Sequence, residues 1–157
     1  MNIIFLDVDG VLNTYSGFGG ISYLEPNCLE NLQKLVRATN AKIVVSSSWR
    51  MHDSARKKLI ETLKDYDLDK DVIGWTPILG TFTVGPSRGH EIWTYMSTLL
   101  NWPDNFIILD DDKIYMDDFL PNLVKVNGWV GLTEENVKEA IAKLSGPIES
   151  DYKRTFS

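Results

Sequence analysis

Three short apolar runs in this chain each end at a cluster of polar residues, and this repeated arrangement constrains the fold more than any other feature. The runs cover residues 3–6, 43–45 and 106–109. A short continuous apolar run is typical of a strand buried on both faces of a parallel sheet. Ligands of open parallel sheets bind beyond the carboxyl ends of the strands, so the clusters predict a functional site at one sheet edge.

Helical patterns separate the predicted strands along the chain, as in βαβ units joined by right-handed crossovers. We expect helices near residues 26–39, 53–65, 87–100 and 134–145, and further strands near 71–75 and 123–126. The predicted fold is therefore α/β, a Rossmann-like three-layer sandwich with a five-stranded parallel sheet. Residues 1–157 are expected to form a single domain, with residues 146–157 as a loosely packed tail.

The third of these helices is expected to start after Ser87, which would cap it, and to stop at Asn101. Its predicted apolar face contains Ile92, Trp93, Met96, Leu99 and Leu100.

Composition limits the class of protein. A chain of 157 residues with 43% hydrophobic and 24% charged residues is typical of one globular domain. No apolar run reaches bilayer length and no basic segment precedes one, so we expect a cytoplasmic protein without membrane contact. Cys28 is the only cysteine, which excludes an internal disulfide and a zinc cluster. The net charge of -6 disfavours a large nucleic-acid footprint but still permits binding of one nucleic-acid end.

Asp7 and Asp9 follow the first apolar run and lie two residues apart. If strand geometry continues, both side chains point the same way. Two carboxylates about 4 Å apart repel by about 4 kcal/mol at an effective dielectric constant of about 20. A divalent cation is the simplest compensation, although two aspartates after a strand are also common as turn formers and helix caps.

The other two clusters are Ser46-Ser47-Ser48-Trp49-Arg50 and Asp110-Asp111-Asp112. Ser46 directly ends a strand, where its hydroxyl and the following backbone N–H are placed to hold a phosphate oxygen. The alternative for the serine run is a turn that caps the next helix. The aspartate run predicts metal binding, with a solvated acidic turn as the alternative.

In their order along the chain, these motifs resemble the haloacid dehalogenase (HAD) superfamily of phosphohydrolases over residues 1–145. The segment Asp7-Val-Asp9-Gly10-Val-Leu-Asn13 is similar to the first motif of that family, and Ser46 is similar to the second. Arg88, at the start of a predicted helix, occupies the place of the third motif, for which Lys113 competes. Asp110-Asp111 is similar to the fourth.

The resemblance implies that Asp7 attacks the phosphoryl group and becomes an aspartyl phosphate. Asp9 would protonate the leaving oxygen and then activate water. It also implies that Ser46, a backbone amide near Ser47, and Arg88 hold the phosphoryl group. Mg²⁺ is the expected cofactor, with ligands among hard oxygens: Asp7, the backbone carbonyl of Asp9, Asp110 or Asp111, and waters.

Cap domains in this superfamily are inserted at two places, and here the segments 15–20 and 76–85 are both too short for one. We expect a flexible flap and a short hairpin there, and an open site. Capless relatives often act on macromolecular phosphates, and the pieces at 47–50 and 88–92 resemble a subgroup linked to RNA repair.

The expected substrate is therefore a nucleic-acid 3'-phosphate or a nucleoside monophosphate, and no obligate protein partner is expected. A terminal base is predicted to stack on an aromatic side chain. Candidate substrate contacts are Asn13, Tyr15, Phe18, Trp49 and Arg50, while His52 and His90 are interpreted as structural or rim residues.

Two alternatives use the same kind of fold. A receiver-type phosphoacceptor domain also gathers aspartates, but it places its acidic pair first and its acceptor aspartate after the third strand. A silent binding module would not need Asp7, Asp9, Ser46, Arg88 and Asp110 together.

Overall fold

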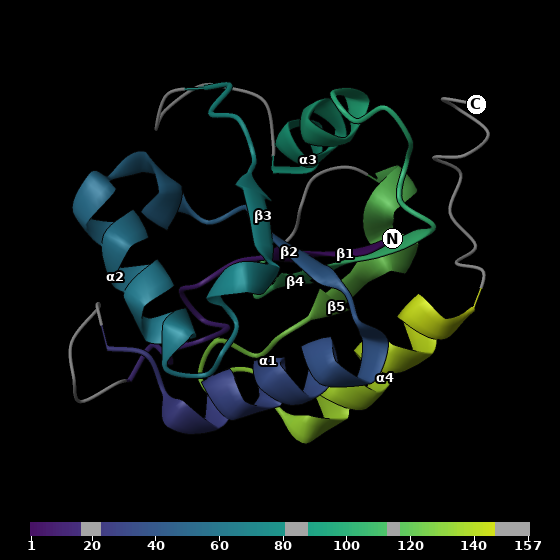
Figure 1. Ribbon diagram of the computed structural model, residues 1–157. Coiled ribbons are helices and arrows are strands. Elements are labelled where there is room, and N and C mark those ends of the chain that lie inside the picture. Colours follow the sequence, from purple (N-terminus) through teal and green to yellow (C-terminus); the bar gives the residue numbers. More distant parts are fainter. Residues whose placement is uncertain (17–22, 81–87, 113–116, 147–157) are drawn as a thin grey trace.

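The structure, a computed structural model, describes residues 1–16, 23–80, 88–112 and 117–146. Its centre is a five-stranded sheet in the order β3-β2-β1-β4-β5 in which every neighbouring pair is parallel (Figure 1). The strands are β1 (Asn2–Leu6), β2 (Lys42–Val45), β3 (Val72–Trp75), β4 (Asn105–Asp110) and β5 (Leu123–Lys125). The predicted α/β class and five-stranded parallel sheet are confirmed, and the described residues contain no separate cap domain.

Helices cover both faces of the sheet (Figure 1). On one face pack α1 (Pro26–Thr39), α2 (Asp53–Lys64) and α4 (Glu134–Ser145), and on the other packs α3 (Arg88–Ser97). Short 3-10 turns at Ser48–Met51, Asp69–Asp71 and Asp117–Asn122 lie between these elements.

The ends of the helices follow from local sequence. Pro26 stands in the first turn of α1, where its missing N–H costs nothing. Asn40 ends that helix in the left-handed conformation, with φ 53°. Thr133 caps α4 through a capping box with Asn136, so each residue satisfies a backbone N–H of the other.

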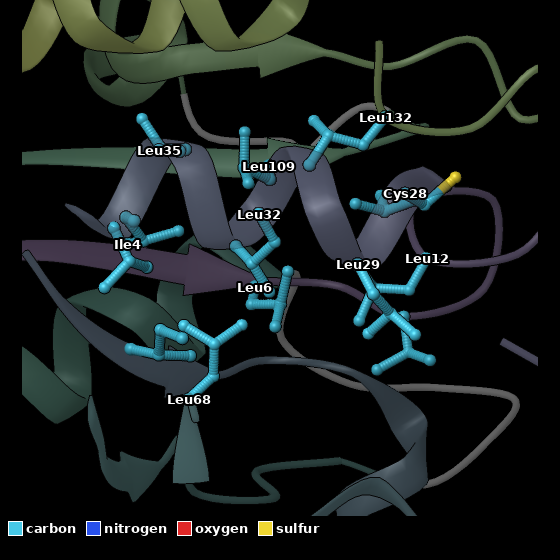
Figure 2. Packing of buried hydrophobic residues seen from close by; sticks show 14 of the residues in the cluster. Ile4, Leu6, Leu12, Cys28, Leu29, Leu32, Leu35, Leu68, Leu109 and Leu132 are labelled. Atoms are coloured by element: carbon cyan, nitrogen blue, oxygen red, sulfur yellow. The ribbon is translucent and has the colours of Figure 1, made fainter. Parts of the chain in front are cut away.

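The larger core lies between the sheet and α1, α2 and α4. Figure 2 shows side chains of β1 (Ile4, Leu6), β4 (Leu109) and α1 (Leu29, Leu32, Leu35) meeting in it. A smaller cluster on the other face packs α3 against β1 and β4, and its aromatic rings meet edge to face, with Phe5 and Phe106 centroids 5.8 Å apart. The two cores fix the sheet from both sides, which places the strand ends rigidly.

One expectation about α3 is wrong. The helix ends at Ser97, and Leu100 is fully exposed and not part of the buried face. The backbone tightens after the helix, since Thr98 and Leu99 donate to the carbonyls three residues earlier. Leu99 still packs against the core, whereas the next residue is turned toward solvent.

Several sequence-based expectations fall outside the described residues. These are the cap at Ser87, the stacking candidate Phe18, the competing cation Lys113, most of the flap at 15–20, the end of the hairpin at 76–85 and most of the tail at 146–157.

The strand register brings the three polar clusters together. Leu6, the last residue of β1, pairs with Val45 of β2 and Leu109 of β4. The next backbone N–H groups extend this pairing, because Ser46 donates to the Leu6 carbonyl at 2.9 Å and Asp7 donates to the Leu109 carbonyl at 3.0 Å. The side chains that follow β1, β2 and β4 therefore start from adjacent positions at one edge of the sheet.

Candidate active site

Three carboxylates from two strand ends form a compact cluster. Asp7, Asp110 and Asp111 each present an oxygen within 4.8 Å of the others. Asp7 is 5% exposed and Asp110 is 1% exposed, so little water screens their repulsion. Burial raises the pKa of Asp7 well above its usual range, Arg88 lowers it, and Asp110 raises it further. The cluster therefore carries a charge that the protein itself only partly compensates.

Arg88, the first residue of α3, lies against this cluster. Its Nη1 is 2.5 Å from Oδ2 of Asp110 and 3.2 Å from Oδ2 of Asp7. Burial acts to lower the pKa of Arg88, but the charges of Asp7 and Asp110 outweigh it and raise that pKa, so the guanidinium stays charged. Its side chain is 26% exposed.

Asp111 differs from the other two carboxylates because it accepts a hydrogen bond from the Tyr15 hydroxyl. Burial acts to raise the pKa of Asp111, but side-chain hydrogen bonds, first the one from Tyr15, outweigh it and lower the pKa. The same hydrogen bond raises the pKa of Tyr15 to about 12. Asp111 thus remains an anion at the margin of the cluster.

Gly10 is required by the close approach of Asp111. Its φ is +80°, a backbone conformation that residues other than glycine rarely adopt. A Cβ added there would lie 2.4 Å from Oδ2 of Asp111. The glycine of the first motif therefore makes room for the carboxylate supplied by the fourth.

The donor set of the cluster fits a hard divalent cation. All three candidate ligands are carboxylate oxygens, which suit Mg²⁺, Ca²⁺ or Mn²⁺ better than metals that prefer nitrogen and sulfur. Such a cation would offset the repulsion that raises the pKa of Asp7. Asp7, Asp110 and Asp111 are thus the residues that could hold the metal.

The Asp9 carboxylate lies outside this group of three and is exposed. Its Oδ1 accepts hydrogen bonds from Nδ2 of Asn13, at 2.9 Å, and from Nε1 of Trp49, at 3.0 Å. The two donors fix the carboxylate of Asp9 next to the cluster. A metal contact through the backbone carbonyl of Asp9 stays a prediction.

Asn13 and Trp49 contact Asp9 and not open solvent. Asn13 is 6% exposed, and its Oδ1 accepts from the Gly10 N–H at 2.8 Å, so its amide holds the loop together. Trp49 is 8% exposed, and its ring packs in the larger core. Both were predicted as substrate contacts, and the geometry makes them positioning residues for Asp9.

Ser46 contributes an unsatisfied hydroxyl. The residue is fully buried, and among the described residues its Oγ has no hydrogen-bond partner. A buried polar group without a partner is costly, so such a group at a ligand site points to a bound polar atom. Ser47 is occupied differently, since its Oγ accepts the Trp49 N–H at 3.2 Å as an N-terminal cap.

Arg50 has all five of its donors engaged. Nε donates to the Thr76 carbonyl, Nη1 to the carbonyls of Ser46 and Ser47, and Nη2 to the Pro77 carbonyl and to Oε2 of Glu91. The Glu91 contact is 2.7 Å long, and both side chains are buried. Arg50 was predicted as a substrate contact, but none of its donors is left for a substrate. It ties the loop after β2 to α3.

Two features of this region were missed from the sequence. Glu91 is one, because nothing in the sequence pattern pairs it with Arg50, a residue 41 positions earlier. Trp129 was not noted at all, although it lines a cavity with Tyr15. A tryptophan in a glycine-containing loop after a strand, Asn127-Gly128-Trp129, was the available signal.

Comparison with known proteins defines the class to which this arrangement belongs, the HAD domains, which are phosphatase-type hydrolases and typically metal-dependent. The chain belongs to the family described as the HAD domain in Swiss Army Knife RNA repair proteins, whose model matches residues 3–137. The resemblance drawn from the motifs is confirmed. Searches of curated proteins and of solved structures gave no match. In the described part of the chain, no helix is long and apolar enough to span a membrane.

Proposed function

We propose that this protein is a Mg²⁺-dependent phosphomonoester hydrolase that works through an aspartyl phosphate on Asp7. The proposal rests above all on one observation: a cluster of three carboxylates, two of them buried, beside the unpaired hydroxyl of Ser46 at the carboxyl edge of a parallel sheet. The first feature suits a cation and the second suits an anion. A phosphate ester bound with a metal ion supplies both.

The chemistry divides into two displacements. A carboxylate oxygen of Asp7 attacks phosphorus and the bond to the leaving oxygen breaks, while Asp9 gives that oxygen a proton. A water then attacks the aspartyl phosphate as Asp9 takes its proton, which releases phosphate and restores Asp7. Oδ1 of Asp9 is held by Asn13 and Trp49, so we assign proton transfer to Oδ2.

Several groups stabilise the negative charge on the phosphoryl group during its transfer. The Ser46 hydroxyl donates to a phosphoryl oxygen, and the Arg88 guanidinium, which lies 3.2 Å from Oδ2 of Asp7, attracts the same group. When bound, Mg²⁺ neutralises charge on the phosphoryl oxygens and on the carboxylates. The held geometry of Asp7, Asp9 and Ser46 then supplies orientation.

The substrate class is a nucleotide or the terminal phosphate of a nucleic acid, with the 3'-phosphate favoured. Two observations support it. The family model describes a domain of RNA repair proteins, and no cap domain encloses the site among the described residues. A site without a cap leaves room for a substrate longer than one nucleotide.

The test is a phosphate-release panel with and without Mg²⁺. It compares oligonucleotides carrying a 3'- or 5'-phosphate, nucleoside monophosphates, sugar phosphates and phosphopeptides. We expect turnover that requires Mg²⁺ and is highest for a nucleotide or a 3'-phosphorylated strand. Replacing Asp7 with Asn should abolish it without changing the circular dichroism spectrum, whereas Asp65→Asn, at an exposed helix end, should leave it unchanged.

Two results would contradict the proposal. Phosphate release that Asp7→Asn leaves intact would remove the nucleophile from the mechanism. A stable phosphoprotein that never turns over would favour a non-hydrolytic phosphoacceptor on the same fold.

A further inference from the structure

A cavity of about 420 Å³ lies beside the carboxylate cluster. Its walls come from Tyr15, Asp111, Lys125 and the loop 126–129 that follows β5. Asp111 belongs to both features, since it also forms part of the carboxylate cluster. A ligand in the cavity therefore touches the edge of the proposed phosphate site.

Two aromatic rings stand at this cavity with much of their surface in solvent. Tyr15 is 53% exposed and Trp129 is 66% exposed. Their ring centroids are 5.2 Å apart and their planes meet at 85°, an edge-to-face pair. Exposed aromatics gathered at a hollow are typical of a surface that binds another flat apolar group.

The loop that carries Trp129 is fixed by its own hydrogen bonds. The N–H groups of Trp129 and Gly131 donate to Oδ1 and the carbonyl of Asn127, at 3.0 and 2.8 Å. Leu132 then donates to the Val11 carbonyl at 2.8 Å, which ties the loop to the segment after β1. The ring of Trp129 is thus presented by an ordered backbone, which lowers the entropic cost of binding.

Tyr15 is held against the same loop. Its N–H donates to the Gly128 carbonyl at 2.9 Å, and its hydroxyl donates to Asp111. A Cβ at Gly128 would lie 2.0 Å from Cζ of Tyr15, so the ring lies directly on the glycine backbone. Tyr15 therefore links the aromatic wall of the cavity to the carboxylate cluster.

Lys125 adds a cation to a chain of net charge -6. It pairs in the sheet with Asp110, the residue that begins the acidic run, and its side chain is exposed. A cation here suits the negative backbone of a nucleotide strand.

We propose that this cavity is the base-binding subsite for the nucleotide whose phosphate is hydrolysed. The inference rests on the proposed function and adds to it the residues that would select a nucleotide. Trp129 and Tyr15 supply aromatic contact to the base, and Lys125 attracts the adjoining phosphate of a strand. The cavity volume lies within the range of about 300–1,000 Å³ that is usual for small-molecule sites.

Trp129→Ala tests the subsite through substrate preference. The assay compares kcat/KM for a nucleoside 3'-monophosphate with kcat/KM for glycerol phosphate, an ester without a ring. Loss of a stacked base costs about 5- to 150-fold in affinity. We expect the preference for the nucleotide to fall about tenfold, mainly through KM, and Trp129→Phe to restore most of it. Leu100→Ala, which truncates another exposed apolar side chain, should leave the preference unchanged.

A binding measurement distinguishes a free nucleotide from the end of a nucleic-acid strand as the ligand of this cavity. Calorimetric titration of the metal-free protein with a nucleoside monophosphate and with a 3'-phosphorylated trinucleotide compares wild type with Trp129→Ala and Lys125→Gln. The first variant should weaken both ligands about tenfold. The second should weaken the trinucleotide more than the monophosphate.

The outcomes distinguish this inference from the proposed function. If wild type releases phosphate from neither the nucleotide nor glycerol phosphate but nucleotide binding still depends on Trp129, the hydrolase proposal fails and the subsite stands. If Trp129→Ala changes neither the substrate preference nor the binding of either ligand, the subsite is overturned whatever the enzyme's activity.

Discussion

Two groups of buried charge meet at the same edge of the sheet and differ in how far they are compensated. Arg50 gives all five of its donors to Glu91 and to four backbone carbonyls. The cluster of Asp7, Asp110 and Asp111 has Arg88 against two of its carboxylates, and burial still raises the pKa of Asp7. The first group is complete without a ligand, whereas the second is balanced only when something cationic joins it. The contrast separates a structural ion pair from a binding site.

Removing the compensated cation should have the largest effect on stability. Arg50→Met leaves the buried Glu91 carboxylate without its cation and removes the donors that hold the carbonyls of the loop after β2. Breaking a buried pair in this way costs about 3–5 kcal/mol. Urea unfolding followed by circular dichroism measures the change in the free energy of unfolding.

The matched control for that variant is Arg37→Met. Arg37 pairs with Asp67 and Asp71 at the surface, and its side chain is 47% exposed. Its loss should cost less than about 1 kcal/mol. Equal losses for the two variants would show that the Arg50 network is no more important than a surface pair.

Binding of Mg²⁺ to the carboxylate cluster should have the second-largest effect on the free energy of unfolding. At a free concentration 100 times its Kd, a ligand of the native state adds about 2.7 kcal/mol to the free energy of unfolding. Thermal unfolding with and without Mg²⁺ measures this, and Asp110→Asn should lose the stabilisation because it removes a buried ligand oxygen. A wild-type melting temperature that Mg²⁺ does not change would count against a metal at this cluster.

Replacing Asp7 with Asn in the metal-free protein should raise the free energy of unfolding, by less than Arg50→Met lowers it. Burial raises the pKa of Asp7, so the folded state holds the proton more tightly than the unfolded chain. That stabilisation is complete below the unfolded pKa of about 3.9 and is lost as pH rises through the higher folded pKa. At pH 7 the neutral Asn should therefore raise the free energy of unfolding.

The measurement is urea unfolding in EDTA between pH 3 and pH 8, with Asp65→Asn beside it. The advantage of Asp7→Asn should grow with pH and shrink when Mg²⁺ is added. If Asp7→Asn were less stable than wild type throughout this range, the cluster would be compensated already, and its contrast with the Arg50 network would disappear.

The sequence predicted the fold well because the signals for it are local. Each buried strand is a short apolar run. Pro26 marks a helix start through its missing N–H, and Thr133 marks another through its side-chain cap. The prediction that Leu100 is buried was wrong because helical spacing does not reveal where a helix ends. The backbone of α3 tightens after Ser97, and beyond that point the periodic pattern no longer predicts which residues are buried.

The part of the candidate site that lies at the strand ends could be predicted from the sequence. Asp7, Ser46 and Asp110 come together because the parallel register aligns their strands. The partners of Arg50 could not be predicted, since Glu91 reaches it through the packing of α3 and not through any nearby sequence pattern. The same holds for Trp129, which meets Tyr15 only because the loop after β5 folds back on the segment after β1.

The most direct measurement is to find where the phosphoryl group goes during turnover. The protein is mixed with Mg²⁺ and a phosphorylated nucleotide, quenched in acid and digested, and its peptides are examined by mass spectrometry. The account predicts an acid-trapped phosphate on Asp7 of the wild type during turnover, and no phosphate on the protein in Asp7→Asn. Full turnover with Asp7 unmodified, or with the phosphate on a different residue, would contradict it.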